Sequence, residues 1–110
     1  MPPSRSDLQQ GTLELLILRT LALGPLHGWA ISQRIRQLSK DVLQVQQGSL
    51  YPTLYRLRDQ GLVRSEQSTS EEGRRVRIYH LTASGRQRLE QATESWRTLT
   101  TAVEAVLSAT

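Results

Sequence analysis

The sequence predicts a mainly α-helical domain that carries one small β-hairpin. Four segments have the apolar spacing of helices, two short segments between residues 62 and 82 have strand character, and a polar loop joins those two. The chain has 110 residues, which fits one small domain. A domain of this size is only marginally stable by itself, so a second subunit is plausible from length alone.

Two helices are predicted in the first 40 residues. Residues 9–23 carry leucine or isoleucine on nearly every side, so this helix must be covered on more than one face. A Gly-Pro pair ends it, and a second helix is expected over residues 27–39, with His27 as its cap. Residues 43–45 then alternate apolar and polar side chains, a pattern that suits a short strand.

A third helix is predicted over residues 48–61, where leucines at helical spacing form a buried stripe and a glycine closes the segment. Its other positions carry hydroxyls, a phenol and guanidinium groups. Pro52 is tolerated if the helix starts near Ser49, because the amides of a first turn have no partner within the helix. Those free amides can also meet a phosphate.

Residues 62–68 and 75–82 are the predicted strands, and they form a hairpin with a basic tip. Thr82 can cap a last helix that runs toward residue 108. Apolar residues repeat along this helix at alternating steps of three and four, as in a heptad seam: Leu89, Ala92, Trp96, Leu99, Val103 and Val106. The seam is short, so it could join two subunits or pack on the apolar first helix.

The net charge of +4 is unevenly spread along the chain. Residues 56–88 carry eight arginines against four acids, whereas residues 89–110 carry one arginine and three glutamates, so the middle is basic and the tail acidic. Thirteen of the fourteen cations are arginine, whose planar group binds phosphate or guanine through two hydrogen bonds. An arginine-rich coding bias with solvated charges would give the same composition.

Several functional classes lack support in the sequence. The chain has no cysteine, and its two histidines have no carboxylate or second histidine at metal spacing, so we expect neither metal nor cofactor. No nucleophile and base stand in a catalytic pattern, so we expect no enzyme. Residues 1–6 lack the apolar run of a signal peptide, and no apolar stretch is long enough to span a membrane. We therefore expect a cytoplasmic protein that is not bound to a membrane.

The order helix, helix, strand, helix, strand, strand is that of a winged helix-turn-helix. We assign residues 9–82 to this domain, residues 1–8 to a flexible N-terminal arm and residues 83–110 to a C-terminal dimerisation helix. In this fold the third helix lies in the major groove of DNA, and the hairpin wing contacts the backbone or the minor groove. The alternative is a small helical domain whose basic residues are simply solvated.

Four blocks of the sequence resemble the PadR family of bacterial transcriptional regulators. They are Leu-His-Gly-Trp at 26–29, the block that opens Gly-Ser-Leu-Tyr-Pro at 48–57, Gly-Leu-Val at 61–63, and residues 74–85. The resemblance covers about residues 10–90, and the single C-terminal helix is similar to the short PadR subgroup. Trp29 stands where tyrosine is usual, and Arg58 where glutamate is usual.

The resemblance implies a dimeric winged-helix repressor and gives roles to individual residues. Ser49 and Thr53 would face the groove, and the Tyr51 phenol would contact a phosphate. We expect Tyr79 in the core, whereas Tyr55 could contact DNA or cover the wing. The expected DNA-binding residues are Ser49, Tyr51, Thr53, Arg56, Arg74, Arg75 and Arg77.

The functional hypothesis is a sequence-specific DNA-binding regulator, a repressor that binds a pseudo-palindromic operator as a homodimer. The rival is a winged-helix module that binds another protein without contacting DNA, and the basic wing tip argues against it. Trp96 has two interpretations: it belongs to the core, or it lines a site for a planar apolar effector between two subunits. The expected partners are therefore double-stranded DNA, a second copy of the chain and, in the second interpretation, such an effector.

Overall fold

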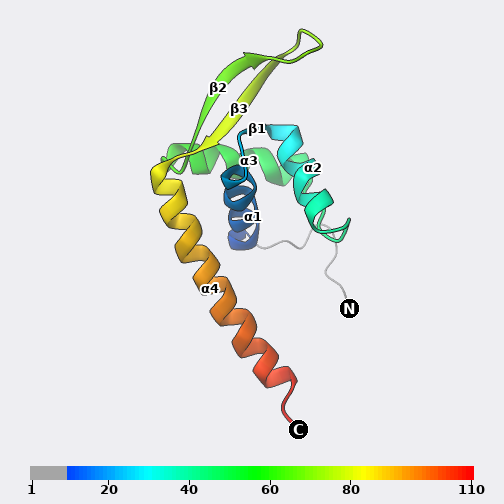
Figure 1. Cartoon of the computed structure of the whole chain (residues 1–110), viewed down its shortest axis with the longest axis vertical. Coiled ribbons are helices and arrows are strands. Elements are labelled where there is room, and N and C mark those ends of the chain that lie inside the picture. Colours follow the sequence, from blue (N-terminus) through cyan, green and yellow to red (C-terminus); the bar gives the residue numbers. More distant parts are fainter. Residues whose placement is uncertain (1–9) are drawn as a thin grey trace.

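The computed structural model describes residues 10–110, and the predicted arm lies outside this range. Helices α1 to α3 form the body, a β-hairpin projects from one side, and a long last helix runs away on the other side (Figure 1). In chain order the elements are α1 (Gln10–Ala22), β1 (Leu26–His27), α2 (Gly28–Leu38), α3 (Gln47–Asp59), β2 (Val63–Thr69), β3 (Arg75–Leu81) and α4 (Ala83–Leu107).

The short strand lies elsewhere than predicted. β1 precedes α2 and pairs antiparallel with β3, with Leu26 opposite Tyr79, so the sheet order is β1-β3-β2. Residues 43–45 form no strand. Leu43 and Val45 pack against the core from a connecting segment, and the Leu43 amide donates to the Ser39 hydroxyl at 3.0 Å. The alternation there reflects half-burial of a loop, and the chain runs helix, strand, helix, helix, strand, strand, helix.

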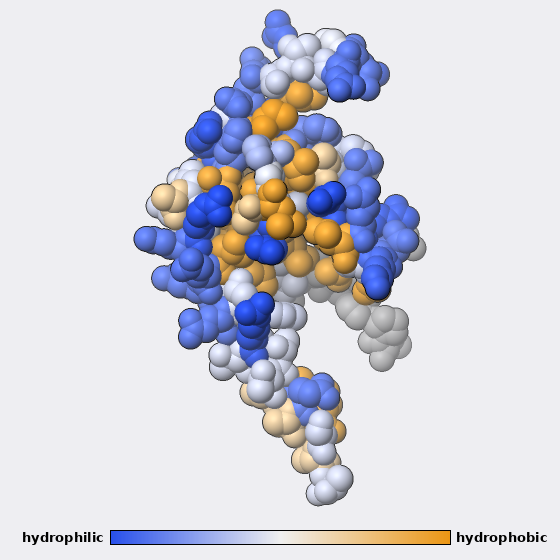
Figure 2. Space-filling model, viewed as in Figure 1, coloured by the Kyte–Doolittle hydropathy of each residue, from blue (hydrophilic) through white to orange (hydrophobic). Residues whose placement is uncertain are grey.

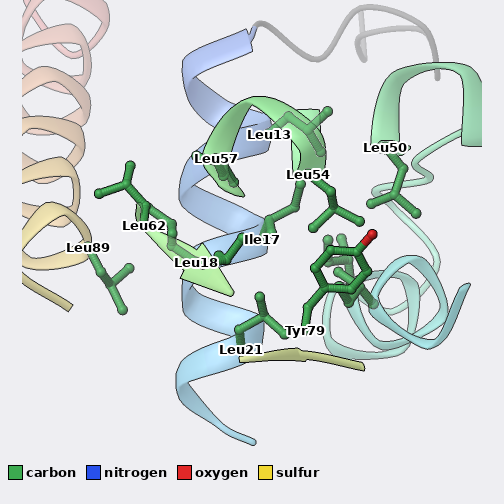
Figure 3. Packing of buried hydrophobic residues seen from close by; sticks show 13 residues of the cluster. Leu13, Ile17, Leu18, Leu21, Leu50, Leu54, Leu57, Leu62, Tyr79 and Leu89 are labelled. Atoms are coloured by element: carbon green, nitrogen blue, oxygen red, sulfur yellow. The ribbon is translucent and has the colours of Figure 1, made fainter. Parts of the chain in front are cut away.

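Helix α1 is the centre of the core. Leu13, Ile17, Leu18 and Leu21 are at most 3% exposed, because α2, α3, β3 and α4 all pack against this helix. Figure 3 shows their side chains directed toward leucines of α3 and the Tyr79 ring. The expectation that this apolar helix is covered on more than one face is confirmed.

Side-chain caps hold two helix starts in place. The Ala30 amide donates to His27 Nδ1 at 3.3 Å, so His27 caps α2 as predicted. Thr82 caps α4 by accepting from the Gly85 amide at 3.0 Å, and its hydroxyl donates to the Gly61 carbonyl at 2.7 Å. A Cβ at Gly85 would collide with the Leu62 carbonyl. The start of α4 is therefore packed directly on the turn that follows α3.

Helix α3 begins at Gln47, earlier than expected, so Pro52 lies in its second turn. The explanation that Pro52 occupies a first turn is therefore wrong. Its ring replaces an N–H that would otherwise donate to the Gly48 carbonyl, and the helix continues despite the loss. Leu50, Leu54 and Leu57 are fully buried, and this packing compensates for the missing hydrogen bond.

Only the first part of α4 packs on α1. Leu89 is 9% exposed and belongs to the core cluster of its own chain, so most of its side chain is covered without a partner, and its place in a dimer seam stays a prediction. Beyond it, Trp96 is 43% exposed, Leu99 56%, Val103 47% and Val106 75%. The described part of the chain extends over 59 Å as a result. Among its helices, none is long and apolar enough to cross a membrane.

Candidate nucleic-acid interface

The exposed side of α3 faces away from α1 and begins at an open helix end. Gln46 is the N-cap residue and makes no side-chain cap hydrogen bond, while Gln47, Gly48 and Ser49 are all exposed. The amides of a first turn point outward along the helix axis and carry partial positive charge. Ser49 thus lies at the surface, as the sequence predicted.

Thr53 does not face outward. Its side chain is 1% exposed, and its hydroxyl donates to the Ser49 carbonyl one turn earlier at 2.8 Å. Position 53 lies one turn from both Leu50 and Leu57 on the buried stripe, so the core covers it. The expectation that Thr53 faces a DNA groove is wrong.

Arg56 is engaged within the protein. Its Nη2 and Nε donate to Oε1 of Glu14 on α1, at 2.7 and 3.2 Å. The side chains are 38% and 22% exposed, so this ion pair is partly shielded from water. The prediction that Arg56 binds DNA did not take account of Glu14, which lies 42 residues away in sequence. Arg56 connects α3 to α1.

Tyr51 packs on the start of α2. A Cβ on Gly28 would lie 2.7 Å from Cε1 and 2.9 Å from the hydroxyl oxygen of Tyr51, so only glycine leaves room for this ring. The Tyr51 ring centroid is 6.2 Å from that of Tyr55. The Leu-His-Gly and Gly-Ser-Leu-Tyr-Pro blocks of the sequence therefore meet in space, and the Tyr51 phenol lies where α2 begins.

Tyr55 and Arg58 extend this surface toward the end of α3. Tyr55 is 45% exposed, and the Arg58 guanidinium carbon lies 5.2 Å from its ring centroid. Arg58 Nη2 also lies 3.7 Å from Oδ1 of Asp59, a distance at the limit of an ion pair. Neither Tyr55 nor Arg58 was among the predicted site residues. The signal that could have found Arg58 is its departure from the glutamate usual in the related family.

The hairpin presents Arg75 and Arg77 on the same side as the core. Val63 and Tyr79 are buried, and strand alternation puts Arg75 and Arg77 on their face of β2 and β3, farther toward the tip. Arg77 Nη1 donates to the Ser65 hydroxyl at 3.2 Å, so its side chain bends back toward the root of the hairpin. Arg74 is exposed at the tip.

The opposite face of the hairpin differs in charge. Arg64 lies opposite His80 in the strand pairing, and His80 Nε2 is 2.7 Å from Oε1 of Glu66. A carboxylate therefore lies on this outer face, next to a histidine. The inner face carries Arg75 and Arg77 instead.

Tyr79 lies beneath the junction of α3 and the hairpin. It is 2% exposed, which confirms the prediction that it belongs to the core. Burial raises the pKa of its phenol, and the charges of Tyr55, Arg77 and Arg58 and of Tyr51 also act on it. Tyr79 of β3 belongs to the same core cluster as Leu54 and Leu57 of α3, and β2 packs against α3. The α3 surface and the root of the inner wing face therefore lie next to each other.

A hollow lies between α1 and α4. This open cleft of about 990 Å³ is lined by Leu15 and Leu16 of α1 and by Leu89 and Trp96 of α4. Trp96 is therefore a wall of a cleft and not a core residue. In the described range, no cluster of three or more histidine, cysteine or acidic side chains could hold a metal ion.

The sequence model of the transcriptional regulator PadR-like family matches residues 17–91. The chain belongs to this family. It is 38% identical to the transcriptional regulator Rv3488 of Mycobacterium tuberculosis over 85 residues, which cover 77% of this chain and 76% of that protein. The PadR resemblance seen in the sequence is thereby confirmed, and the chain is a transcriptional regulator of this family.

Solved structures of similar regulators share the fold of this PadR-like chain. A PadR-like transcriptional regulator from Bacillus cereus superposes with a TM-score of 0.80 at 28% identity, covering 96% of this chain and 100% of that one. A transcriptional regulator from Clostridium thermocellum gives a TM-score of 0.82 at 25% identity, covering 91% and 97%. The predicted fold class, a winged helix-turn-helix followed by a long helix, is confirmed.

Proposed function

We propose that this PadR-like regulator binds duplex DNA directly, with α3 in the major groove and the wing on the neighbouring backbone or minor groove. One observation carries the proposal: the exposed side of α3 and the inner wing face form adjacent surfaces rich in arginine and tyrosine. Arg58, Arg75 and Arg77 lie there, and the nearest carboxylate oxygen to Arg58 that forms an ion pair is that of Asp59, at 3.7 Å. Guanidinium groups and phenols are the side chains that bind backbone phosphates.

The proposed active form is a homodimer joined through α4. Apolar side chains of α4 lie uncovered, and the cleft beside α1 is open. Figure 2 shows hydrophobic surface over the body around α1, whereas the wing is largely hydrophilic. A second copy related by a two-fold axis would cover the apolar side chains of α4 and the cleft beside α1. The dimer would then present two copies of α3 to the two halves of a pseudo-palindromic operator. Occupation of such an operator would repress by blocking a promoter.

Trp96 supports a finer proposal, that the dimer binds a planar apolar effector. The indole is 43% exposed beside an apolar cleft, where a flat molecule could stack on it. Such compounds should quench the fluorescence of the parent and should not quench that of Trp96→Phe. Trp29 remains in that variant and serves as the internal control. Equal quenching in both proteins would contradict the effector proposal.

The rival function, a module that binds a protein and not DNA, predicts a different response to salt. Each neutralised phosphate releases about one counterion, so DNA affinity of this regulator should fall by orders of magnitude between low and moderate salt. A gel shift on the DNA upstream of its own and neighbouring genes, repeated over a salt series, makes this measurement. Absence of binding, or affinity that ignores salt, would contradict the DNA proposal.

The wing assignment has its own test. Arg74→Ala with Arg75→Ala should weaken binding to all duplexes alike, because phosphate contacts carry no sequence information. The matched control is Arg64→Ala with Arg88→Ala, which removes the same charge from exposed positions on the outer wing face and on α4. Equal losses from the two double variants would show that net charge matters and wing position does not.

A further inference from the structure

Arg58 and Arg77 come from different elements, and both lie near the junction between α3 and the hairpin. Arg58 lies near the end of α3, where its guanidinium group contacts the Tyr55 ring. Arg77 comes from β3, and its hydrogen bond to Ser65 directs it back toward the root of the hairpin. Ser65 lies opposite Tyr79, the ring on which both arginines act electrostatically. The two cations therefore flank the junction between α3 and the wing.

The protein itself does not neutralise this pair. Within residues 10–110, Arg77 forms no ion pair with a carboxylate. Arg58 has Asp59 at 3.7 Å, with side chains 41% and 74% exposed, and an exposed pair at that distance is worth little. Arg56 differs, because Glu14 neutralises it at 2.7 Å. Neither exposed guanidinium group is fully compensated by a carboxylate of the described residues, so both can bind an external anion.

We propose that Arg58 and Arg77 bind one phosphate of the DNA backbone between them. This inference rests on the proposed function and names a contact within the same surface. When α3 enters a major groove and the wing reaches the next minor groove, one strand of the backbone must pass between them. The Tyr55 ring restrains the Arg58 group before DNA arrives, and the Ser65 hydroxyl restrains that of Arg77, so little side-chain freedom is lost on binding.

The test measures affinity for a short duplex of mixed sequence over a salt series, with Arg58→Gln, Arg77→Gln and the double variant. Each single variant should weaken binding on the order of fivefold at moderate salt. The slope of log affinity against log salt is negative. If one phosphate is shared, the double variant should reduce the magnitude of this slope by about 0.9 per bound subunit. Two separate phosphates would lower it by about 1.8 per bound subunit, which would overturn the shared site.

Two further variants make the result specific to position and to chemistry. Arg64→Gln removes the same charge from the outer wing face and should bind like the parent. Arg58→Lys keeps the charge and should retain the parental slope. If Arg58→Gln binds no worse than Arg64→Gln, the inference is wrong while the proposed function stands. If the parent itself binds no duplex, the proposed function fails first. Circular dichroism should show parental folding throughout, because both arginines are exposed.

Discussion

The apolar residues of the winged-helix body are buried, whereas those of the distal half of α4, beyond Leu89, are exposed. In the body, the apolar residues of the core cluster are 0 to 9% exposed, and contacts within the chain bury them. On distal α4, Leu99, Val103 and Val106 are 47 to 75% exposed. The core cluster of the body is therefore buried by contacts within one chain. Distal α4 instead leaves an apolar stripe uncovered, and an exposed stripe of this kind marks an interaction surface.

The largest expected effect comes from a substitution that disrupts the association proposed through the distal half of α4. Leu99→Asp places a carboxylate on the uncovered stripe, and a symmetric dimer would bury two of them. We expect the dimer dissociation constant to rise at least about a hundredfold, which corresponds to about 2.7 kcal/mol. Analytical ultracentrifugation over a concentration series measures it.

The matched control for this change is Thr101→Asp, which adds the same charge to an exposed position on the other side of the helix. It should leave the association unchanged. The body of both variants should stay folded, since the core cluster ends at Leu89. If Leu99→Asp and Thr101→Asp associate equally well, α4 does not form the interface.

A smaller effect tests the body, where Gly28 leaves no room for a side chain beside Tyr51. Gly28→Ala puts a methyl group 2.7 Å from Cε1 of that ring, and such overpacking costs about 1 to 3 kcal/mol, partly offset by the better helix propensity of alanine. Chemical denaturation should show a net loss of stability, and DNA affinity should fall with the displacement of Tyr51.

Gly11→Ala is the control for Gly28→Ala, because a methyl group at position 11 meets nothing within 4 Å. It should be neutral or slightly stabilising. Adding Tyr51→Ala to Gly28→Ala should cost less than the sum of the two single changes, since the clash disappears with the ring. Strict additivity would mean that the close approach to Tyr51 is not what makes Gly28 necessary.

A still smaller effect is expected from the ion pair between Arg56 and Glu14. Both side chains are partly exposed, so the pair should contribute about 0.5 to 1 kcal/mol in a double-mutant cycle with Arg56→Gln and Glu14→Gln. Because Arg56 contacts α1, neither change should alter the preference between operator variants. If Arg56→Gln changed the preference between operator variants and Glu14→Gln did not, Arg56 would contact DNA after all.

Local pattern was enough to predict the four helices and the hairpin, since spacing, caps and turn residues are all encoded within a few positions. It also predicted His27 and Thr82 as caps and Tyr79 as a core residue, and the structure confirms all three. The errors concern contacts between distant segments. β1 forms only because β3 lies beside it, and Arg56 turns from the surface only because Glu14 lies opposite. No neighbouring residue signals either contact.

The site was predicted less completely than the fold for the same reason. The sequence alone does not show which element packs on the helix face that carries a polar residue. Thr53 lies on the buried face of α3, and its hydroxyl can be buried there because it donates a hydrogen bond to the Ser49 carbonyl. Arg58 was assigned no role, because its value as a ligand depends on the Tyr55 ring and on an arginine of another strand. Adjacency of this kind appears only in the folded structure, in which β2 packs against α3.

The smallest expected effect concerns Tyr79, which is buried beneath the proposed DNA-binding surface where α3 meets the wing. Burial raises the pKa of its phenol above the ordinary value of 10.0, so the unfolded chain loses this proton at lower pH than the folded protein does. The contribution of the neutral Tyr79 phenol to the free energy of unfolding is complete below pH 10. It declines as the pH rises from there through the pKa of the folded state. Tyr79→Phe has no proton to lose, so the stability of the parent should fall more steeply than that of the variant in this alkaline range. Denaturation midpoints measured in parallel on both proteins give the difference, and curves that stay parallel above pH 10 would show that the phenol is not buried in solution as it is in this fold.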